Sequence, residues 1–257
     1  MITDSEAAPA PLDLAGSVAL VTGATRGLGL AIARKLCMSG CGVLLNYAHD
    51  ENAARAAAGA LDGLGPKVHA VRADIGEPGD VGRLLDDIWR THGRLDILVH
   101  NAVVFHPMPT TALRADLCDL DRAVVLGPLL HGIEQLTELM PSGSGRIIAV
   151  SSSGASAVIP RYVSLGMAKA ALESLVRYLA VELAGRGITV NTVAVGKLGQ
   201  PGSDPAGLPA RVAARTPAGR LTTPADVADV IALLCRPEAG WIHGETISID
   251  GGLRLLA

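Results

Sequence analysis

The sequence lacks the features that mark membrane, secreted and nucleic-acid-binding proteins. Although 49% of its residues are apolar, they form no uninterrupted run of about 18 residues, so we expect no membrane span. The 22 basic and 25 acidic residues form no blocks, and the net charge of -3 argues against nucleic acid as a partner. The four cysteines have no CxxC spacing, which predicts neither a disulfide framework nor a metal site. Small molecules are therefore the expected partners.

The N-terminus also lacks a targeting signal. Residues 1–15 contain Pro, Ala and acidic side chains without a basic segment followed by an apolar one, which is typical of a flexible tail. We therefore expect a cytoplasmic protein. A chain of 257 residues fits one α/β domain, to which we assign residues 16–257.

Short apolar segments alternate with helical segments along this domain. The apolar segments lack the alternation of a half-exposed sheet, which indicates a mainly parallel sheet covered by helices on both faces. The predicted fold is a doubly wound α/β domain with seven strands, and such sheets bind ligands at the carboxyl ends of their strands. The expected strands lie at 18–23, 43–47, 67–75, 95–102, 146–153, 188–195 and 245–252, and the main helices at 29–40, 51–64, 81–91, 117–139 and 163–184.

One Pro- and Gly-rich stretch interrupts this alternation after the sixth strand. It spans 196–209 and contains the sequence GKLGQPGSDPAGLP. At the carboxyl edge of the sheet, it predicts a substrate loop of about 196–216 that closes over a pocket as a mobile lid. The alternative is a tolerated surface insertion.

A glycine-rich segment joins the first expected strand to the first helix. The segment 22–29 has the sequence TGATRGLG, which gives the spacing TGxxxGxG. Glycines permit a tight turn and bring backbone amides close to a pyrophosphate, whose charge is favoured at a helix N-terminus. The segment therefore predicts dinucleotide binding by Gly23, Thr25, Arg26, Gly27, Leu28 and Gly29.

The end of the second strand predicts which dinucleotide binds. An acidic residue there would accept hydrogen bonds from ribose hydroxyls and would repel a 2′-phosphate. The strand instead ends with LNYAH, in which Tyr47 belongs to the cofactor turn, and no carboxylate precedes Asp50. Arg26 in the glycine loop can pair with phosphate. The expected cofactor is NADPH, or NADP+ in its oxidised form.

From Ser17 to the C-terminus the chain resembles the short-chain dehydrogenase/reductase family. Besides the glycine loop, the resemblance rests on RADI at 72–75, HNA at 100–102, SSS at 151–153, AKAAL at 168–172 and ISIDGG at 247–252. His100 and Val103 depart from the family's NNAG motif. The resemblance implies a Rossmann-type fold, with Asp74 and Ile75 at the adenine, Asn101 and Ala102 in the cofactor cleft, Lys169 on the nicotinamide ribose and Ser152 as the active-site serine.

The tyrosine of the active site is displaced. The family's tyrosine lies four residues before the lysine, and Leu165, which donates no proton, stands at that position. Tyr162 stands seven residues before Lys169, and seven steps of 100° come within about 20° of two turns, so both share a face if the helix extends that far. Because Tyr47 belongs to the cofactor turn and Tyr178 lies well beyond the lysine, Tyr162 is the candidate. The alternative is a surface aromatic at a helix start.

The Tyr-x6-Lys spacing resembles the type III, NADPH-dependent enoyl-acyl-carrier-protein reductases. The resemblance implies reduction of the C=C bond of an enoyl thioester, carried by acyl carrier protein or coenzyme A, in fatty acid or polyketide biosynthesis. Tyr162 and Ser152 would stabilise the enolate oxygen, while Lys169 would fix the ribose and bias the tyrosine. Ser151 and Ser153 are the alternatives to Ser152.

Two other functions remain open. Val124 stands where the family places an asparagine, and a valine cannot hold the water that relays protons to the lysine. A ketoreductase of polyketide or other secondary metabolism and a redox-inactive cofactor-binding member of the family are the alternatives. The apolar side chains of the helix that contains Val124 are typical of core or of a subunit interface, and the resemblance implies a homotetramer.

Overall fold

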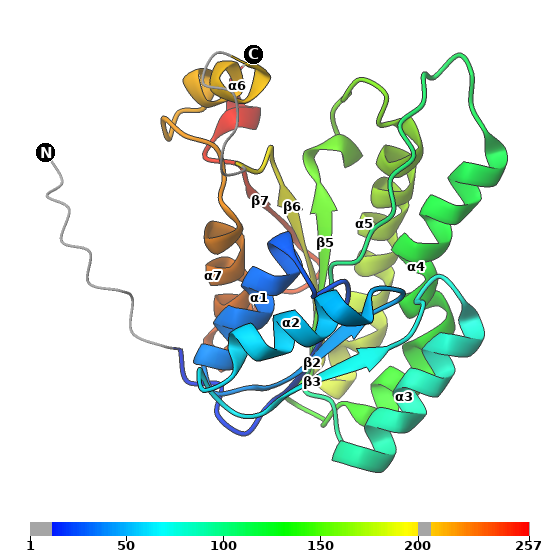
Figure 1. Ribbon diagram of the computed structural model, residues 1–257, viewed down its shortest axis with the longest axis vertical. Helices are drawn as coiled ribbons and strands as arrows, with labels where there is room; N and C mark the ends of the chain where they lie inside the picture. Colours follow the sequence, from blue (N-terminus) through cyan, green and yellow to red (C-terminus); the bar gives the residue numbers. More distant parts are fainter. Residues whose placement is uncertain (1–11, 200–206, 257) are drawn as a thin grey trace, which may run out of the picture.

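The sheet contains seven strands, and all neighbouring strands run parallel (Figure 1). The computed structural model describes residues 12–199 and 207–256. The strand order is β3-β2-β1-β4-β5-β6-β7. The order reverses between β1 and β4, where such sheets open a ligand crevice. The strands are β1 (Val18–Val21), β2 (Gly42–Tyr47), β3 (Val68–Arg72), β4 (Ile97–His100), β5 (Arg146–Ser152), β6 (Thr189–Val195) and β7 (Thr246–Ile249).

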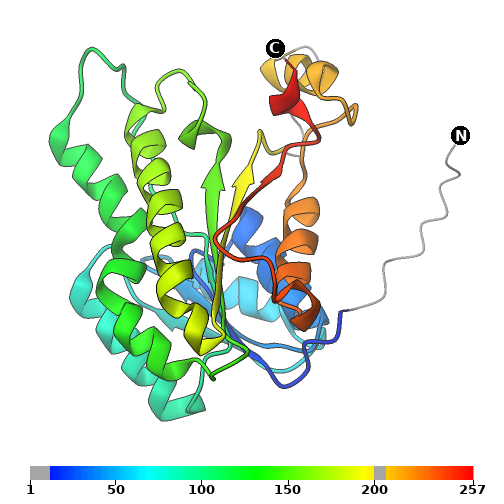
Figure 2. The same ribbon diagram turned by 180° about the vertical axis from the view of Figure 1, so that it is seen from behind.

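Helices cover both faces of this sheet (Figures 1 and 2). The helices α1 (Gly27–Met38), α2 (Glu51–Leu61) and α7 (Pro224–Leu234) share one buried core with the sheet, and α3 (Pro78–His92), α4 (Ala115–Leu139) and α5 (Val163–Leu183) share the other. Strands covered on both sides need no polar face, and β6 is buried at every position. The predicted doubly wound fold is therefore confirmed.

Two helices lie where the sequence predicts none. Helix α6 (Leu208–Arg215) occupies the second half of the expected loop at 196–216, and α7 lies between β6 and β7. Residues 200–206 of the expected lid lie outside the described residues, as do residues 1–11 of the expected tail. Leu14, which the sequence also assigns to that tail, is buried in the core beneath α1 and α7.

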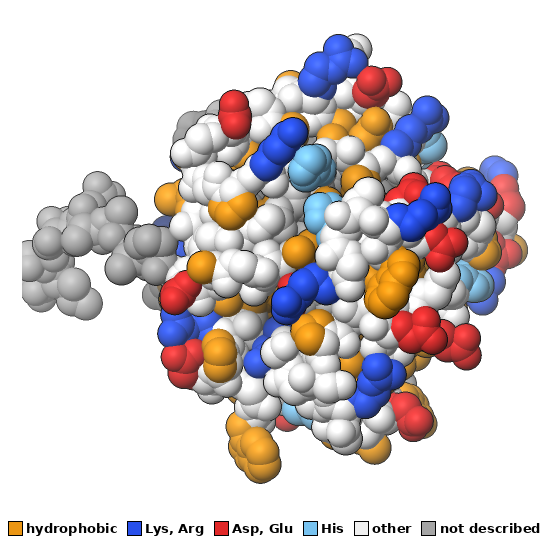
Figure 3. Space-filling model, turned by 90° about the horizontal axis from the view of Figure 1, so that it is seen from below, with side chains coloured by type: hydrophobic (Ala, Val, Ile, Leu, Met, Phe, Trp, Pro, Cys, Tyr) orange, Lys and Arg blue, Asp and Glu red, His pale blue; other side chains and the backbone are white. Residues whose placement is uncertain are grey.

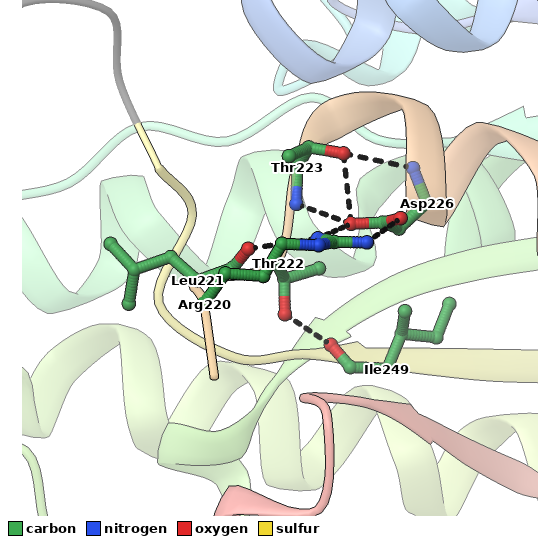
Figure 4. A network of polar contacts seen from close by, with 6 residues as sticks. All are labelled: Arg220, Leu221, Thr222, Thr223, Asp226 and Ile249. Atoms are coloured by element: carbon green, nitrogen blue, oxygen red, sulfur yellow. Dashed lines mark hydrogen bonds and ion pairs between the residues drawn. The ribbon is translucent and has the colours of Figure 1, made fainter. Parts of the chain in front are cut away.

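The chain that enters α7 is held by a polar network, which Figure 4 shows. Thr223 and Asp226 form a capping box, in which the Asp226 N–H donates to Thr223 Oγ1 and the Thr223 N–H donates to Asp226 Oδ2. The Arg220 guanidinium donates to both Asp226 oxygens, at 2.6 and 2.8 Å. The Thr222 hydroxyl donates to the Ile249 carbonyl of β7 at 3.1 Å. These contacts anchor the segment after α6 to the carboxyl end of the sheet.

The surface carries charges of both signs (Figure 3), and most of the cysteines are buried. Charges of both signs mix over the face seen in Figure 3. Cys37, Cys41 and Cys235 are buried thiols, as expected, whereas Cys118 is half-buried. None of the described helices is long and apolar enough to cross a membrane. Among residues 12–199 and 207–256, no group of His, Cys, Asp and Glu side chains is arranged to hold a metal ion.

Candidate active site

A cleft of about 890 Å³ opens at the carboxyl ends of β1, β2 and β4. This is the point at which the strand order reverses, where doubly wound sheets bind nucleotides. Apart from Lys169, every residue for which the sequence predicts cofactor contact lines the cleft. These residues are Gly23, Thr25, Arg26, Gly27, Leu28, Gly29, Tyr47, Asp74, Ile75, Asn101 and Ala102.

The first turn of α1 fits a pyrophosphate. Among the described residues no side chain caps this helix, and its first turn carries no acidic residue. The leading N–H groups of a helix have no intrahelical acceptor and attract anions. The turn is tightly folded, because a Cβ at Gly29 would lie only 2.2 Å from the Gly23 carbonyl oxygen. Only glycine at position 29 therefore permits this turn.

The turn after β2 fits a 2′-phosphate. Asp50, Asp74 and Glu77 line the cleft, and the first two carboxylates have N–H partners. Asp50 accepts from the Ala53 N–H at the start of α2, and Asp74 accepts from the Gly76 N–H and lies 3.8 Å from the His49 ring. Arg26 is exposed in the same cleft. Its cation and the neighbouring imidazole favour a further phosphate.

His100 supports the floor of the cleft in place of the family's first asparagine. Its Nε2 donates to the Val125 carbonyl of α4 at 2.8 Å, and the Thr22 hydroxyl donates to its Nδ1 at 3.0 Å. Thr22 Oγ1 in turn accepts from the N–H groups of Asn101 and Ala102, each at 3.0 Å. Burial lowers the pKa of His100 to about 4, so the ring is neutral near pH 7. This network joins the ends of β1 and β4 to α4.

Lys169 lies on α5 and is not among the described residues that line the cleft. Its Nζ donates to the Val150 carbonyl at 2.6 Å. Burial lowers the pKa of Lys169 to about 8, although the Glu173 carboxylate opposes this change. An ammonium has three donors, so two remain for the ribose contact that the sequence predicts. That contact stays a prediction.

Tyr162 is the N-cap residue of α5 and does not lie inside the helix. A helix face shared with Lys169 requires the helix to extend back to Tyr162, whereas the helix begins at Val163, as the sequence predicts. The preceding residue, Arg161, has φ 63°, a left-handed conformation that cannot continue a helix. The phenol ring packs against Phe105, with 5.2 Å between the ring centroids. The Tyr162 carbonyl accepts from the Gly166 N–H at 2.7 Å, so Tyr162 is held both by the first turn of α5 and by the loop that carries Phe105.

The phenol of Tyr162 lies near Ser152 and Asp121. Burial raises the pKa of Tyr162, the Ser152 side chain lowers it, and the Asp121 carboxylate raises it. The bias of the phenol by the Lys169 ammonium stays a prediction. Ser151 instead donates its hydroxyl to Glu173 at 2.6 Å. Of the serines at 151–153, Ser152 is thus the one brought to the phenol.

The two substituted family positions have different surroundings. Leu165 is 3% exposed and packs in the core beneath α3, α4 and α5. Val124 lines the cleft. The leucine is therefore part of the hydrophobic core, and the valine leaves an apolar wall where the family has an amide.

A polar cluster that the sequence does not predict lies next to the phenol. Asp121 of α4 is fully buried, lies 2.7 Å from His106 Nδ1, and accepts from the Ser164 hydroxyl at 2.5 Å. His106 belongs to the loop after β4 and lines the cleft. No motif marks these residues, because they are separated by 15 and 43 positions and only the fold brings them together.

Comparisons with known proteins agree with this geometry. Residues 23–254 match the family model described as enoyl-(acyl carrier protein) reductase. The chain is 37% identical to 1-cyclohexenylcarbonyl-CoA reductase of Streptomyces collinus over 246 residues, which cover 93% of this chain and 88% of that protein.

Solved structures show the same fold. One is a promiscuous reductase that catalyses keto-reduction at C1 during lugdunomycin biosynthesis, with 36% identity and a TM-score of 0.85 over 95% of this chain and 99% of that chain. Another is a short-chain dehydrogenase from Burkholderia cenocepacia in complex with NADP, with 32% identity and a TM-score of 0.85 over 94% and 99%. The chain therefore belongs to the short-chain dehydrogenase/reductase family, within the group that the enoyl-(acyl carrier protein) reductase model describes.

Proposed function

We propose that this chain is an NADPH-dependent reductase that saturates the C=C bond of an enoyl thioester, carried by acyl carrier protein or coenzyme A. One observation carries the proposal. Leu165 fills the position one turn before Lys169. The phenol of Tyr162, which precedes the first residue of α5, interacts with Ser152. The similarity to 1-cyclohexenylcarbonyl-CoA reductase supports a reaction of this kind.

The residues of the cleft fit NADPH. The glycine turn and the first N–H groups of α1 would bind the pyrophosphate, and Arg26 with His49 would face the 2′-phosphate. Asn101 and Ala102 would line the nicotinamide end. When bound, the cofactor supplies a hydride. The similarity to a dehydrogenase in complex with NADP supports this assignment.

The displaced phenol suits enoyl reduction better than ketone reduction. In a ketone, the carbon that accepts hydride is bonded to the oxygen that becomes charged. In an enoyl thioester, hydride goes to Cβ and the charge appears on an oxygen three bonds away. The Tyr162 hydroxyl would lie further from the nicotinamide than the family's tyrosine does. It would therefore lie closer to the thioester oxygen, where a hydrogen-bond donor stabilises the enolate.

The protonation states of the site suit this role. Because burial raises the pKa of Tyr162, the phenol stays protonated near pH 7 and donates its O–H to the thioester oxygen. Ser152 would donate a second hydrogen bond to that oxygen. Lys169, with a pKa of about 8, would be mostly charged near pH 7 and would bind the ribose hydroxyls.

The proposal is tested by mixing the protein with NADPH and crotonyl-CoA and following the absorbance of the reduced nicotinamide. We expect oxidation of NADPH with formation of butyryl-CoA. Tyr162→Phe removes only the hydroxyl and should lower kcat by about 100-fold. Tyr178→Phe is the matched control, because Tyr178 is 77% exposed on the same helix, and it should leave kcat unchanged. A wild-type protein that leaves crotonyl-CoA unreduced would contradict the proposal.

A ketoreductase of secondary metabolism is the second candidate. The similarity to the reductase of lugdunomycin biosynthesis favours it, and Tyr162 would then protonate an alkoxide. Turnover of a ketone without turnover of crotonyl-CoA would support this candidate. Tight binding of NADPH without turnover of either substrate would instead indicate a redox-inactive member of the family.

We also propose that the chain forms a homotetramer through α4 and α5. Leu130 of α4 and Met167 and Val181 of α5 are each more than half exposed, which is unusual for large apolar side chains on two neighbouring helices. Light scattering after size exclusion should give four times the monomer mass. Val181→Glu should reduce that mass.

A further inference from the structure

The reaction proposed above leaves one buried carboxylate without a role. Asp121 is fully buried, and burial of a charge is tolerated only when hydrogen bonds compensate it. Ser164 donates to one carboxylate oxygen at 2.5 Å, and His106 Nδ1 lies 2.7 Å from the other. Since the carboxylate only accepts, Nδ1 carries the proton. The second ring nitrogen, Nε2, is on the far side of the ring from Asp121.

The loop that carries His106 is fixed on both sides of the histidine. Phe105 packs against the Tyr162 ring, and Met108 pairs with Tyr162 in a parallel bridge. The Met108 N–H donates to the Arg161 carbonyl at 3.1 Å. The imidazole is therefore held by Asp121 of α4, and its loop is held by contacts with Tyr162 at the start of α5. Such a rigid setting is typical of a group that transfers a proton.

His106 is also a polar side chain that reaches the cleft. Its side chain is 34% exposed and lines the cleft together with the apolar Val103 and Val124. A proton donor for carbon is therefore available at this end of the cleft in the His106 imidazole.

We propose that His106 is the general acid that protonates Cα of the enoyl thioester, with Asp121 and Ser164 as positioning residues. This inference rests on the proposed function. A carboxylate that accepts from a histidine fixes its tautomer and stabilises the imidazolium, as in the catalytic dyads of hydrolases. The charged groups that face the ring are Asp121 from α4 and, when ionised, Tyr162 from the start of α5.

Hydride from the reduced nicotinamide forms the Cβ–H bond, and the π electrons of Cα=Cβ move to give an enolate whose oxygen accepts the hydrogen bond from Tyr162. The enolate electron pair then forms the Cα–H bond with the Nε2 proton of the imidazolium. The N–H bonding electrons stay on the ring, which becomes neutral and regains a proton from water at its exposed edge.

The first experiment uses His106→Gln, which keeps a polar side chain of similar size without a transferable proton. We expect kcat with crotonyl-CoA to fall by about 100-fold, while KM and the dissociation constant for NADPH change less than about threefold. In heavy water the wild type should place deuterium on one face of C2 of butyryl-CoA, and the variant on both faces. His131→Gln, at an exposed position of α4, is the matched control.

The positioning residues are tested by non-additivity. Asp121→Asn and Ser164→Ala should each lower kcat in the wild-type background and have no further effect in the His106→Gln background. A purely structural carboxylate would lower kcat by the same factor in both backgrounds. If Asp121→Asn fails to fold, Ser164→Ala alone still tests the proposal.

A second experiment needs no turnover. Diethyl pyrocarbonate should modify both His106 and His131, and NADP+ with butyryl-CoA should protect only His106. A folded His106→Gln variant with unchanged kcat and unchanged deuterium placement would overturn the inference and leave the proposed function intact. A wild-type enzyme that reduces ketones but not crotonyl-CoA would overturn both.

Discussion

The ring of Tyr162 packs so closely against Gly154 that a Cβ at Gly154 would lie 2.5 Å from the ring atom Cε1. Gly154→Ala must therefore displace the ring, which Phe105 holds from another direction. We expect kcat with crotonyl-CoA to fall by about 10- to 100-fold, since a shift of about 1 Å misplaces the donor. The dissociation constant for NADPH should stay the same.

The control for this prediction is Gly59→Ala on α2, where an added Cβ meets nothing within 4 Å. This variant should keep full activity and gain about 0.5–1 kcal/mol of stability, because alanine favours a helix. Equal activity of Gly154→Ala and the wild type would show that the ring position does not limit the reaction.

Arg26 should determine the preference for NADPH over NADH. Arg26→Ala removes the exposed cation of the glycine turn, and a charge-assisted hydrogen bond to phosphate contributes about 1.5–3 kcal/mol. We expect KM for NADPH to rise by about 10- to 100-fold and KM for NADH to change little, as measured by initial rates. Arg34→Ala, at an exposed position further along α1, should leave both values unchanged. A parallel rise for both cofactors would argue against a 2′-phosphate contact.

The rate should decline in alkali because of Lys169. Its pKa is lowered to about 8 by burial, so the ammonium is lost as the pH rises through about 8 and kcat should fall there. Glu173 raises this pKa, and Glu173→Gln should therefore shift the alkaline limb of the pH profile to lower pH. Glu182→Gln, exposed on the same helix, should leave the limb in place. A shift of the limb to higher pH would refute the assignment to Lys169.

Asp226 should stabilise the fold in a pH-dependent way. The Arg220 side chain holds the pKa of this carboxyl well below its usual value, burial opposes this, and Thr223 lowers the pKa further. A carboxyl with a lowered folded-state pKa stabilises the fold above its unfolded pKa of about 4, and this contribution is lost as the pH falls further.

Asp226→Asn should therefore lower Tm at pH 7 by about 2–4 °C, the effect of about 1 kcal/mol from a lost cap in a domain of this size. Calorimetry should show that the difference from the wild type narrows between about pH 4 and pH 2. Asp229→Asn on the same helix removes an ion pair with Lys35 but no cap, and its effect should be smaller. A difference that stays constant down to pH 2 would exclude the ionised carboxylate as its source.

The sequence predicts the sheet and the cofactor cleft well because both depend on local signals. Buried parallel strands appear as continuous apolar segments, and the glycine turn places its contacts within residues 23–29. Helix α7 also has a local signal, in the capping box formed by Thr223 and Asp226 with Pro224 between them. The alternation of apolar and helical segments alone does not reveal this helix.

The reacting centre is less predictable because it depends on the start of one helix and on distant contacts. The sequence predicts the start of α5 at residue 163 but not the chain conformation before it, because no residue-type preference announces the left-handed conformation of Arg161. The pairing of His106 with Asp121 joins a loop to a helix across the fold. No spacing rule connects these two residues, and an isolated acidic residue in an amphipathic helix usually faces solvent.

Tyr162 lies just before α5, whereas Lys169 lies within it, so the proposed proton donor and the proposed ribose contact come from separate parts of the chain. Lengthening or shortening the segment 153–162 would move the hydroxyl while the helix that carries Lys169, and the nucleotide cleft below it, stayed as they are. Under the proposed function, reaction type and nucleotide use would therefore depend on different stretches of chain. A library of variants confined to that segment would explore new unsaturated acyl substrates without disturbing the scaffold that binds the reductant.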